Sequence, residues 1–178
     1  MFVPILVGAG VVAWYTGVLG ALVSAAGVGP ALPLPLGSYR VTDKFGPRWR
    51  DPNTQLPVPE GTPGAVLGTH SGVDLGCAEG TPVYSCTDGT VTSVSVGEAN
   101  GLAVFVTEPS GRRWCYLHLS SAVVAPLDKV KRGQQVAFSG RTGRVTGPHL
   151  HLQVYEGTGS GGTTSTTIDP MPLFPAGL

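Results

Sequence analysis

The chain has 178 residues, which is enough for one domain of ordinary size and too few for two. Its 11 Lys and Arg balance its 11 Asp and Glu, and this excludes nucleic acid as the main partner, because phosphate binding needs a basic excess. The 27 Gly and 16 Pro are about twice their usual share, while charged residues make up only 12%. The composition therefore excludes a helical bundle and favours a turn-rich β domain, with room for one membrane segment.

The first 39 residues carry no Asp, Glu, Lys or Arg, and residues 5–28 are almost wholly apolar or small. An apolar run of about 18 or more residues can span a bilayer as a helix. We therefore predict an apolar helix within residues 1–29, serving as a transmembrane anchor, a cleaved signal or a helix buried in an assembly. No basic residue precedes the run, which counts against a signal peptide. Close helix–helix contact is favoured by small residues at every fourth position: Ala9, Ala13, Gly17, Ala21 and Ala25.

Three prolines, Pro30, Pro33 and Pro35, follow the apolar run. They cannot continue a helix and favour an extended spacer. We expect residues 30–37 to form a linker and residues 38–175 to form the globular domain.

From residue 38 onward, short apolar runs rich in β-formers alternate with turn residues. Asp88-Gly89 and Asn100-Gly101 are hairpin turn signals, and Ser110-Gly111 marks a third turn. The pattern predicts a mainly β fold with an antiparallel sheet or sandwich. The expected strands cover residues 82–86, 90–96, 102–107, 113–119, 135–139 and 149–155.

Two stretches read as long loops. Residues 47–69 contain five prolines and show little periodicity, and residues 157–167 are rich in Gly, Ser and Thr. Long loops in a compact domain are often functional rims, although for the second stretch a solvated excursion is the favoured interpretation.

The chain has four histidines, and two of them, His149 and His151, lie two apart on a predicted strand, so they point to one face. His70 and Asp74 share a face in an extended segment. Imidazole and carboxylate suit Zn²⁺, and three protein ligands leave a fourth position open for water, as in catalytic zinc sites. One of the two neighbouring histidines can bind zinc while the other handles protons. His118 lies on another predicted strand and, taken alone, is more typical of an ordinary core or surface residue.

Three segments resemble the lysostaphin/LytM-type zinc metallopeptidases, a family of peptidoglycan endopeptidases. Residues 70–74 read H-S-G-V-D, like the family's H-x-G-x-D segment, and residues 147–151 read G-P-H-L-H, like its second segment. Residues 116–120, Y-L-H-L-S, are similar to the strand with the family's additional histidine. Residues 41–48 resemble its opening strand. The likeness covers residues 38–174, and its motifs are specific because all three occur in the family's order.

The resemblance implies an antiparallel, duplicated-hybrid-motif-like β core with the site in a groove between loops. It implies that His70, Asp74 and His151 bind Zn²⁺. It also implies that His149 and His118 stay unligated and are catalytic, one as general base and both as hydrogen-bond donors to the reacting carbonyl. None of the five positions is substituted, and this favours an active enzyme over a binding module.

The expected function is zinc-dependent hydrolysis of peptide bonds in bacterial peptidoglycan. The alternatives are a virion or phage-tail component that penetrates the wall, and a non-catalytic module that binds peptidoglycan. Because peptidoglycan lies outside the cytoplasmic membrane, we expect the catalytic part there, either anchored through residues 5–28, secreted or carried by a virion. The bond that is cut, the oligomeric state and the host or phage origin do not follow from the sequence.

Three cysteines, Cys77, Cys86 and Cys115, form no C-x-x-C pair, so a structural zinc site is not expected. A Cys77–Cys86 disulfide is conceivable, but three small buried apolar side chains are the favoured interpretation.

Overall fold

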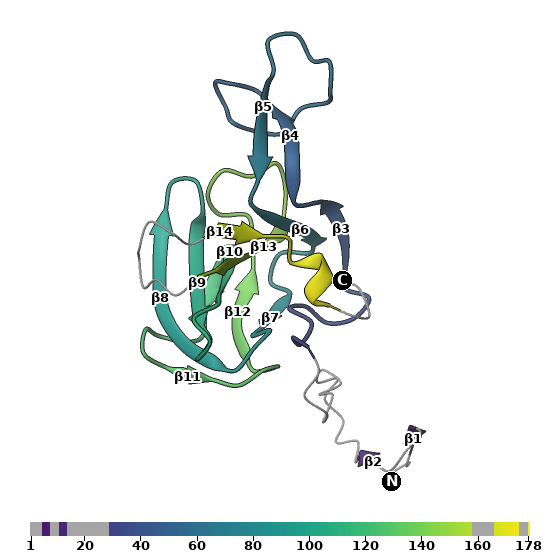
Figure 1. Ribbon diagram of the computed structural model, residues 1–178, viewed down its shortest axis with the longest axis vertical. Coiled ribbons are helices and arrows are strands. Elements are labelled where there is room, and N and C mark those ends of the chain that lie inside the picture. Colours follow the sequence, from purple (N-terminus) through teal and green to yellow (C-terminus); the bar gives the residue numbers. More distant parts are fainter. Residues whose placement is uncertain (1–4, 8–10, 14–28, 158–165, 175–177) are drawn as a thin grey trace.

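The computed structural model describes residues 5–7, 11–13, 29–157, 166–174 and 178 (Figure 1). Strands dominate these residues, as the sequence predicts, and the one helical element is a single 3-10 turn, η1, at Met171–Leu173.

A ten-stranded antiparallel sheet forms the body of the domain. Its central path runs in the order β11 (Lys129–Val130), β8 (Gly89–Gly97), β9 (Gly101–Thr107), β10 (Arg113–Ala122), β13 (His149–Glu156), β6 (Gly72–Cys77) and β3 (Tyr39–Asp43). Three further strands pair off this path, namely β12 (Gln135–Ser139) on β10, β7 (Pro82–Tyr84) on β12 and β14 (Thr166–Ile168) on β13.

The predicted strands are confirmed, and Asn100-Gly101 and Ser110-Gly111 lie between strands that pair with each other. Asp88-Gly89 makes no hairpin, because β7 pairs with β12 while β8 pairs with β9 and β11. Asn100-Gly101 connects β8 to β9, which are paired antiparallel from Thr90↔Thr107 to Gly97↔Gly101. Gly101 takes a φ of 62°, a backbone conformation that glycine adopts without strain. The pairing of β8 with β9 is therefore determined by the short turn that connects them.

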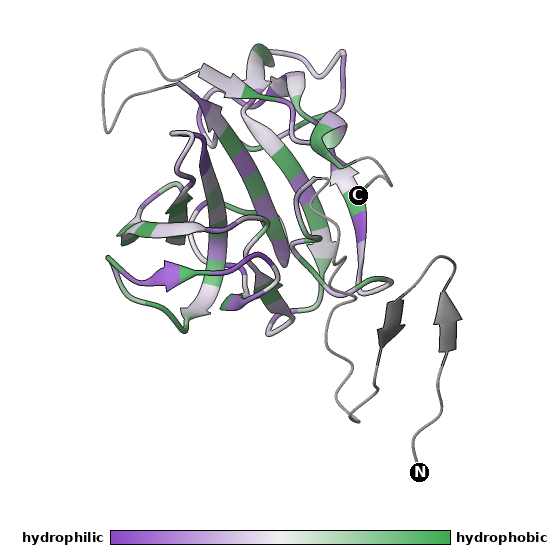
Figure 2. Cartoon of the chain, turned by 60° about the horizontal axis from the view of Figure 1, so that its bottom comes forward, coloured by the Kyte–Doolittle hydropathy of each residue, from purple (hydrophilic) through white to green (hydrophobic). Residues whose placement is uncertain are grey.

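The main core lies on one face of the sheet, and alternating hydrophobic and hydrophilic bands along the strands mark its two sides (Figure 2). Val73, Leu75, Leu150 and Leu152 are fully buried on the neighbouring strands β6 and β13. Burying each such side chain contributes about 1.5–3 kcal/mol. The core therefore holds together the two strands that carry the candidate ligands Asp74 and His151.

The proline-rich segment contains bends and a turn, which the Ser38 backbone N–H closes onto the Pro35 carbonyl, and it packs on the domain. Leu34 is only 1% exposed and belongs to the main core. The Tyr84 backbone N–H donates to the carbonyl of Pro33 at 2.8 Å, and that of Ala31 donates to Cys86 at 2.8 Å. The boundary between linker and domain at residue 38 stays a prediction.

The prediction of a long loop over residues 47–69 is wrong at both of its ends. β4 (Gly46–Arg50) and β5 (Val66–His70) form an antiparallel hairpin that projects beyond β3 and β6 (Figure 1). Pro47 is tolerated because this two-stranded ribbon has open edges, where a missing N–H breaks no ladder bond. The remaining prolines lie in the connection between the two strands.

Most of the predicted apolar helix lies outside the described residues. Within it, β1 (Ile5–Val7) and β2 (Val11–Ala13) pair antiparallel, so these six residues are not helical. Their content of Ile and Val favours extended backbone. No helix among the described residues has the length and apolar character needed to cross a membrane. The predicted loop at 157–167 also falls mostly outside the described residues.

The cysteines are free thiols, and no Cys77–Cys86 disulfide forms. Cys86 and Cys115 are buried, and burial raises the pKa of each thiol to about 12. They are therefore inert apolar groups, as favoured from the sequence, whereas Cys77 is only partly buried.

Candidate metal centre and catalytic groove

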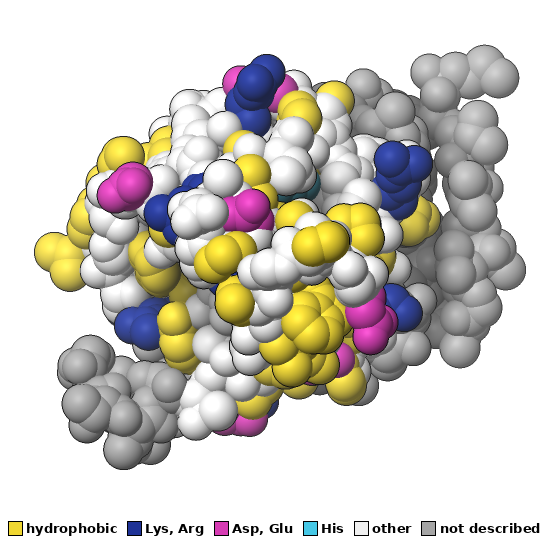
Figure 3. Space-filling model, turned by 90° about the horizontal axis from the view of Figure 1, so that it is seen from above, with side chains coloured by type: hydrophobic (Ala, Val, Ile, Leu, Met, Phe, Trp, Pro, Cys, Tyr) yellow, Lys and Arg dark blue, Asp and Glu magenta, His cyan; other side chains and the backbone are white. Residues whose placement is uncertain are grey.

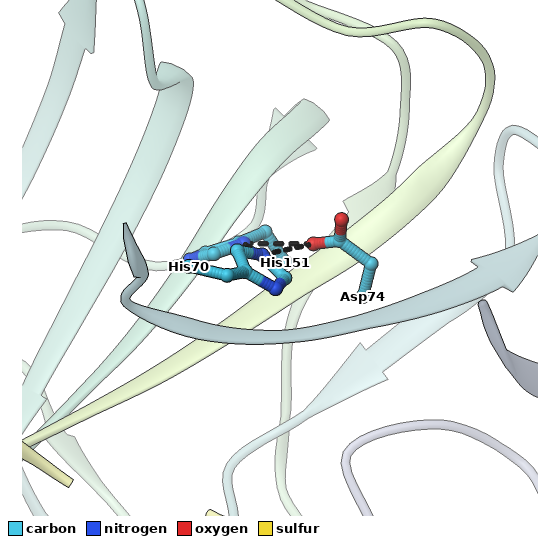
Figure 4. Close-up of side chains that lie close together, drawn as sticks. All are labelled: His70, Asp74 and His151. Atoms are coloured by element: carbon cyan, nitrogen blue, oxygen red, sulfur yellow. Dashed lines mark hydrogen bonds and ion pairs between the residues drawn. The ribbon is translucent and has the colours of Figure 1, made fainter. Parts of the chain in front are cut away.

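Three side chains from three strands converge on one point (Figure 4). His70 ends β5, Asp74 lies in the middle of β6, and His151 lies on β13 directly opposite Asp74 in the strand register. The cross-strand pairing thus brings together residues that are 77 positions apart in the chain.

The ligand-type atoms of these residues form a compact triangle. His151 Nδ1 lies 2.8 Å from Asp74 Oδ1, His70 Nε2 lies 3.2 Å from the same oxygen, and the two nitrogens are 3.1 Å apart. A tetrahedral zinc ion with N and O ligands at about 2.0–2.2 Å separates its ligand atoms by about 3.3–3.6 Å. Two edges of the triangle, at 3.1 and 3.2 Å, are a few tenths of an ångström shorter than that, and the 2.8 Å edge is about 0.5–0.8 Å shorter.

Each imidazole is oriented by a partner on its outer side. His70 Nδ1 donates to the Lys44 carbonyl oxygen at 2.7 Å, and His151 Nε2 donates to Gln153 Oε1 at 3.3 Å. Both outer partners are acceptors, so the outer nitrogens carry the protons and, in neutral rings, the inner nitrogens present lone pairs. Two lone pairs and a carboxylate oxygen face one another, and such a set is satisfied by a cation or by added protons.

The charge of Asp74 suits a metal ligand. Burial opposes its ionisation, but contacts with His151 and His70 outweigh burial and hold the pKa of the carboxyl well below its usual range. Its second oxygen lies 3.7 Å from Arg48 Nη1, and Arg48 also pairs with Asp43. The residues present therefore fit a divalent zinc-type ion.

Gln153 and Gly72 build the outer wall of this triangle, and our sequence analysis singled out neither of them. The Ser71 hydroxyl donates to Gln153 Oε1 at 2.8 Å, which holds the amide against His151. A Cβ at residue 72 would lie 2.3 Å from the Leu152 carbonyl oxygen and 2.8 Å from His151 Nε2, so only glycine lets β6 pass this close. The period-two spacing of His149, His151 and Gln153 is the signal that indicates Gln153.

His118 and His149 lie beside the triangle, with ring centroids 4.8 Å apart. His149 Nε2 is 3.6 Å from Asp74 Oδ1, and the His118 ring lies 5.9 Å from that of His151. Each Nδ1 donates to a backbone carbonyl at 2.9 Å, of Thr142 for His118 and of Gly147 for His149. In neutral rings, both Nε2 atoms are therefore proton acceptors.

A β-bulge turns His118 toward the triangle. The pairing of β10 with β9 shifts between Tyr116 and Leu119, and His118 takes a φ of 63°, which is uncommon for a residue other than glycine. Tyr116 and Leu119 both belong to the main core, so the two residues between them, Leu117 and His118, are on the other side. Such strain is found where the surrounding structure imposes it, often at functional sites.

Burial keeps His118 neutral. The residue is 8% exposed, and desolvation, reinforced by the neighbouring His149, lowers its pKa to about 4. At neutral pH it is thus able to accept a proton.

The five residues open into one hollow, which we call the site groove. All four histidines and Asp74 line it, together with Gln153 and Leu117, and Arg48, Arg50 and Arg144 stand around it. Seen from the hairpin end, the histidines are almost completely covered by other side chains (Figure 3). A second hollow shares Thr146 and His149 with the groove. Two adjoining hollows therefore meet at His149.

Comparison with known proteins gives the class that this fold and site define. Residues 68–170, more than half of the chain, match peptidase family M23. The chain belongs to this family.

Characterised relatives agree with this assignment. The chain is 37% identical over 116 residues to the peptidoglycan DD-endopeptidase ShyA of Vibrio cholerae, covering 65% of this chain and 25% of ShyA. It is 38% identical over 121 residues to lysostaphin of Staphylococcus simulans, covering 66% of this chain and 23% of lysostaphin. The chain thus spans about a quarter of the length of these relatives.

Solved structures share the fold. The catalytic domain of lysostaphin from Staphylococcus simulans matches with a TM-score of 0.60 and 34% identity, covering 75% of this chain and 90% of that one. A zinc-containing peptidase from Vibrio cholerae matches with a TM-score of 0.62 and 31% identity, covering 81% of this chain and 39% of that one.

Proposed function

We propose that this protein is a zinc-dependent endopeptidase that hydrolyses peptide bonds of bacterial peptidoglycan. The observation that carries the proposal is the convergence of His70, Asp74 and His151 beside two unligated histidines. Support comes from the relatives, since both ShyA and the glycyl-glycine endopeptidase ALE-1 of Staphylococcus capitis are named as endopeptidases.

The metal would be held by His70 Nε2, Asp74 Oδ1 and His151 Nδ1. A zinc ion bound there supplies Lewis acidity, which lowers the pKa of water and polarises a carbonyl group. Two neutral imidazoles and one carboxylate would leave the site with a net charge of +1. That charge would stabilise the negative charge that develops on the attacking water.

His118 and His149 would handle the protons. Each Nε2 lies on the side away from its backbone acceptor, and the lone pair of one of them takes a proton from the attacking water. The resulting imidazolium donates that proton to the leaving amine. The other ring would donate to the developing oxyanion only in its protonated form, because its Nδ1 proton is already held by a backbone carbonyl. Thr142 and Gly147 hold both rings in place through their carbonyl oxygens.

Residues 38–175 would form the peptidase domain, and residues 5–28 would hold it at a membrane or within a protein assembly. Since peptidoglycan lies outside the cytoplasmic membrane, the catalytic domain would act there. Fractionation tests the attachment: an anchor stays with lipid vesicles, an assembly component co-purifies with particles, and a released soluble form contradicts both.

The function is tested by digesting purified sacculi with the full chain, with and without a zinc chelator, and identifying the fragments by mass spectrometry. We expect chelator-sensitive release of peptide-cleaved fragments, and their new termini identify the bond. An Asp74→Ala variant serves as the inactive control. Stoichiometric zinc and sacculus binding without any release would overturn the enzymatic proposal in favour of a binding module.

A further inference from the structure

The hollows around the site hold an excess of positive charge. Of the chain's 11 Lys and Arg, Arg40, Arg48, Arg50 and Arg144 line the two hollows, whereas Asp74 is the one lining residue among the 11 Asp and Glu. Arg48 is neutralised by Asp43 and Asp74. The protein is neutral overall, so this concentration of arginines is a local property of the groove.

Arg50 is held in the groove by the β4–β5 hairpin. Its Nη2 donates to the Thr69 carbonyl oxygen, one residue before His70. A Cβ at Gly68 would lie 2.9 Å from both Cδ and Nε of Arg50, so the absence of a side chain at Gly68 makes the channel in which the arginine lies. The fold thus directs this guanidinium along the hairpin toward the candidate metal centre.

Arg50 forms no ion pair among the described residues, although the nearby Asp43 carboxylate partly offsets the effect of burial on its pKa. No carboxylate lies within ion-pair distance, and its buried Nε has no hydrogen-bond partner there. Burial and the neighbouring Arg48 lower the pKa of Arg50, which nevertheless remains protonated at neutral pH. The residue is only partly buried, and Nη1 has no hydrogen-bond partner among the described residues, so the outer part of the guanidinium can receive an incoming anion.

Arg144 is a second cation on the same groove. Its backbone N–H donates to Ala99 at 2.9 Å, which fixes the loop, while its Nη2 lies 3.7 Å from Glu98 Oε1. The Glu98 side chain is 95% exposed, so this ion pair contributes little and is readily exchanged for another anion.

We infer that the groove recognises a peptide with a free carboxylate close to the scissile bond, and that Arg50 is the main residue that binds this carboxylate. The inference rests on the proposed function and narrows its substrate class to acidic stem-type peptides rather than neutral glycine chains. Guanidinium binds a carboxylate through two parallel N–H donors, and for Arg50 these are the Nη groups, because Nε is enclosed by the protein. A neutral peptide leaves the charge of Arg50 without this partner.

The test uses the zinc-loaded full chain and three soluble peptides: a cross-linked stem-peptide dimer with free carboxylates, the same dimer with these groups amidated, and pentaglycine. For the wild type, amidation should raise KM about ten- to a hundredfold with a smaller change in kcat, since a hydrogen bond to a charged group is worth about that factor. Pentaglycine should be the poorest substrate. Arg50→Gln should raise KM for the acidic dimer by a similar factor and leave the amidated dimer almost unchanged.

Arg112→Gln is the matched control, because it also removes one cation but lies away from the groove, paired with Glu156. Its kinetics should equal those of the wild type. Equal KM values for the acidic and amidated dimers, or an equal effect of Arg50→Gln on both, would overturn the inference.

Calorimetric binding of the two dimers to the same proteins separates this inference from the proposed function. If no peptide is cut but the acidic dimer still binds more tightly in an Arg50-dependent manner, the endopeptidase proposal fails and the carboxylate site stands. If peptides are cut without any preference, the endopeptidase stands and the carboxylate site fails.

Discussion

The outer hydrogen bonds of the four histidines divide them into two kinds of group. His70 presents Nε2 and His151 presents Nδ1 to Asp74, because Lys44 and Gln153 occupy their other nitrogens. His118 and His149 are both held through Nδ1 by backbone carbonyls. Two rings are therefore oriented to bind a cation and two to accept protons.

This division predicts different defects for the two kinds of residue. Asp74→Ala and His151→Ala should lose stoichiometric zinc, because two remaining ligands hold the ion poorly. His118→Ala and His149→Ala should keep zinc while turnover falls about 10²- to 10⁴-fold, the usual contribution of a positioned acid or base. Metal analysis together with sacculus digestion checks this. Normal digestion by all four variants would refute the assigned roles.

Gln153 should tune zinc affinity without being a ligand. Gln153→Ala removes the acceptor that fixes the His151 tautomer, and loss of such a partner typically weakens metal binding about 10- to 100-fold. Competition with a chromogenic chelator measures the affinity. Gln153→Glu retains the acceptor and should keep wild-type affinity or exceed it, and an unchanged affinity in the alanine variant would contradict the assignment.

At the scale of the element, backbone irregularities rather than regular strands position the site. The bulge in β10 moves His118 from the core face to the groove face, and Gly72 allows β6 to pass close to His151. The β4–β5 hairpin ends at His70 and carries Arg50, so a segment predicted as a proline-rich loop supplies a groove wall and leads directly into a candidate ligand.

Gly72→Ala should damage both the fold and the metal centre. The new Cβ meets the Leu152 carbonyl at 2.3 Å, which is backbone that cannot move aside cheaply. We expect a loss of about 2–4 kcal/mol in the free energy of unfolding, together with reduced zinc content. Urea denaturation and metal analysis check this. Gly97→Ala on β8 is the matched control, since a Cβ there meets nothing within 4 Å, and a similar loss in both variants would refute the packing argument.

At the scale of the whole molecule, the geometry of the site depends on the stability of the sheet, because the same strands carry site residues and core residues. Asp74 and His151 face the groove from β6 and β13, while their neighbours Val73, Leu75, Leu150 and Leu152 fill the main core on the opposite face. A buried, uncharged histidine in this arrangement lowers stability in acid, because the unfolded chain takes up protons that the folded chain does not.

His118 should account for a measurable part of this acid sensitivity. Its pKa of about 4 in the folded protein lies below the ordinary value of 6.5, so the stability is complete above about pH 6.5 and falls as the pH drops toward 4. In metal-depleted protein, lowering the pH from 7 to 5 should cost the wild type about 1–2 kcal/mol more than His118→Gln. Urea titrations at the two pH values measure the difference. Equal losses in both proteins would show that His118 is not the group responsible.

Much of this protein follows from its sequence alone. The turn dipeptides and short β-rich runs determine most strands, because those preferences are local to a few neighbouring residues. The types and spacings of His70, Asp74, His149 and His151 indicate zinc chemistry, whereas the role of His118 follows only from the resemblance of residues 116–120 to a strand of the peptidase family.

The tertiary structure decided how segments that are distant in the sequence lie relative to one another. The register that sets His151 opposite Asp74, the bulge that turns His118 to the groove and the channel over Gly68 that holds Arg50 depend on cross-strand hydrogen bonds and core packing. Those energies arise between residues far apart in the chain, so local pattern carries no record of them. The hairpin of residues 46–70 differs from the predicted loop over 47–69 for the same reason, since its strands form by pairing with each other rather than by their own propensities.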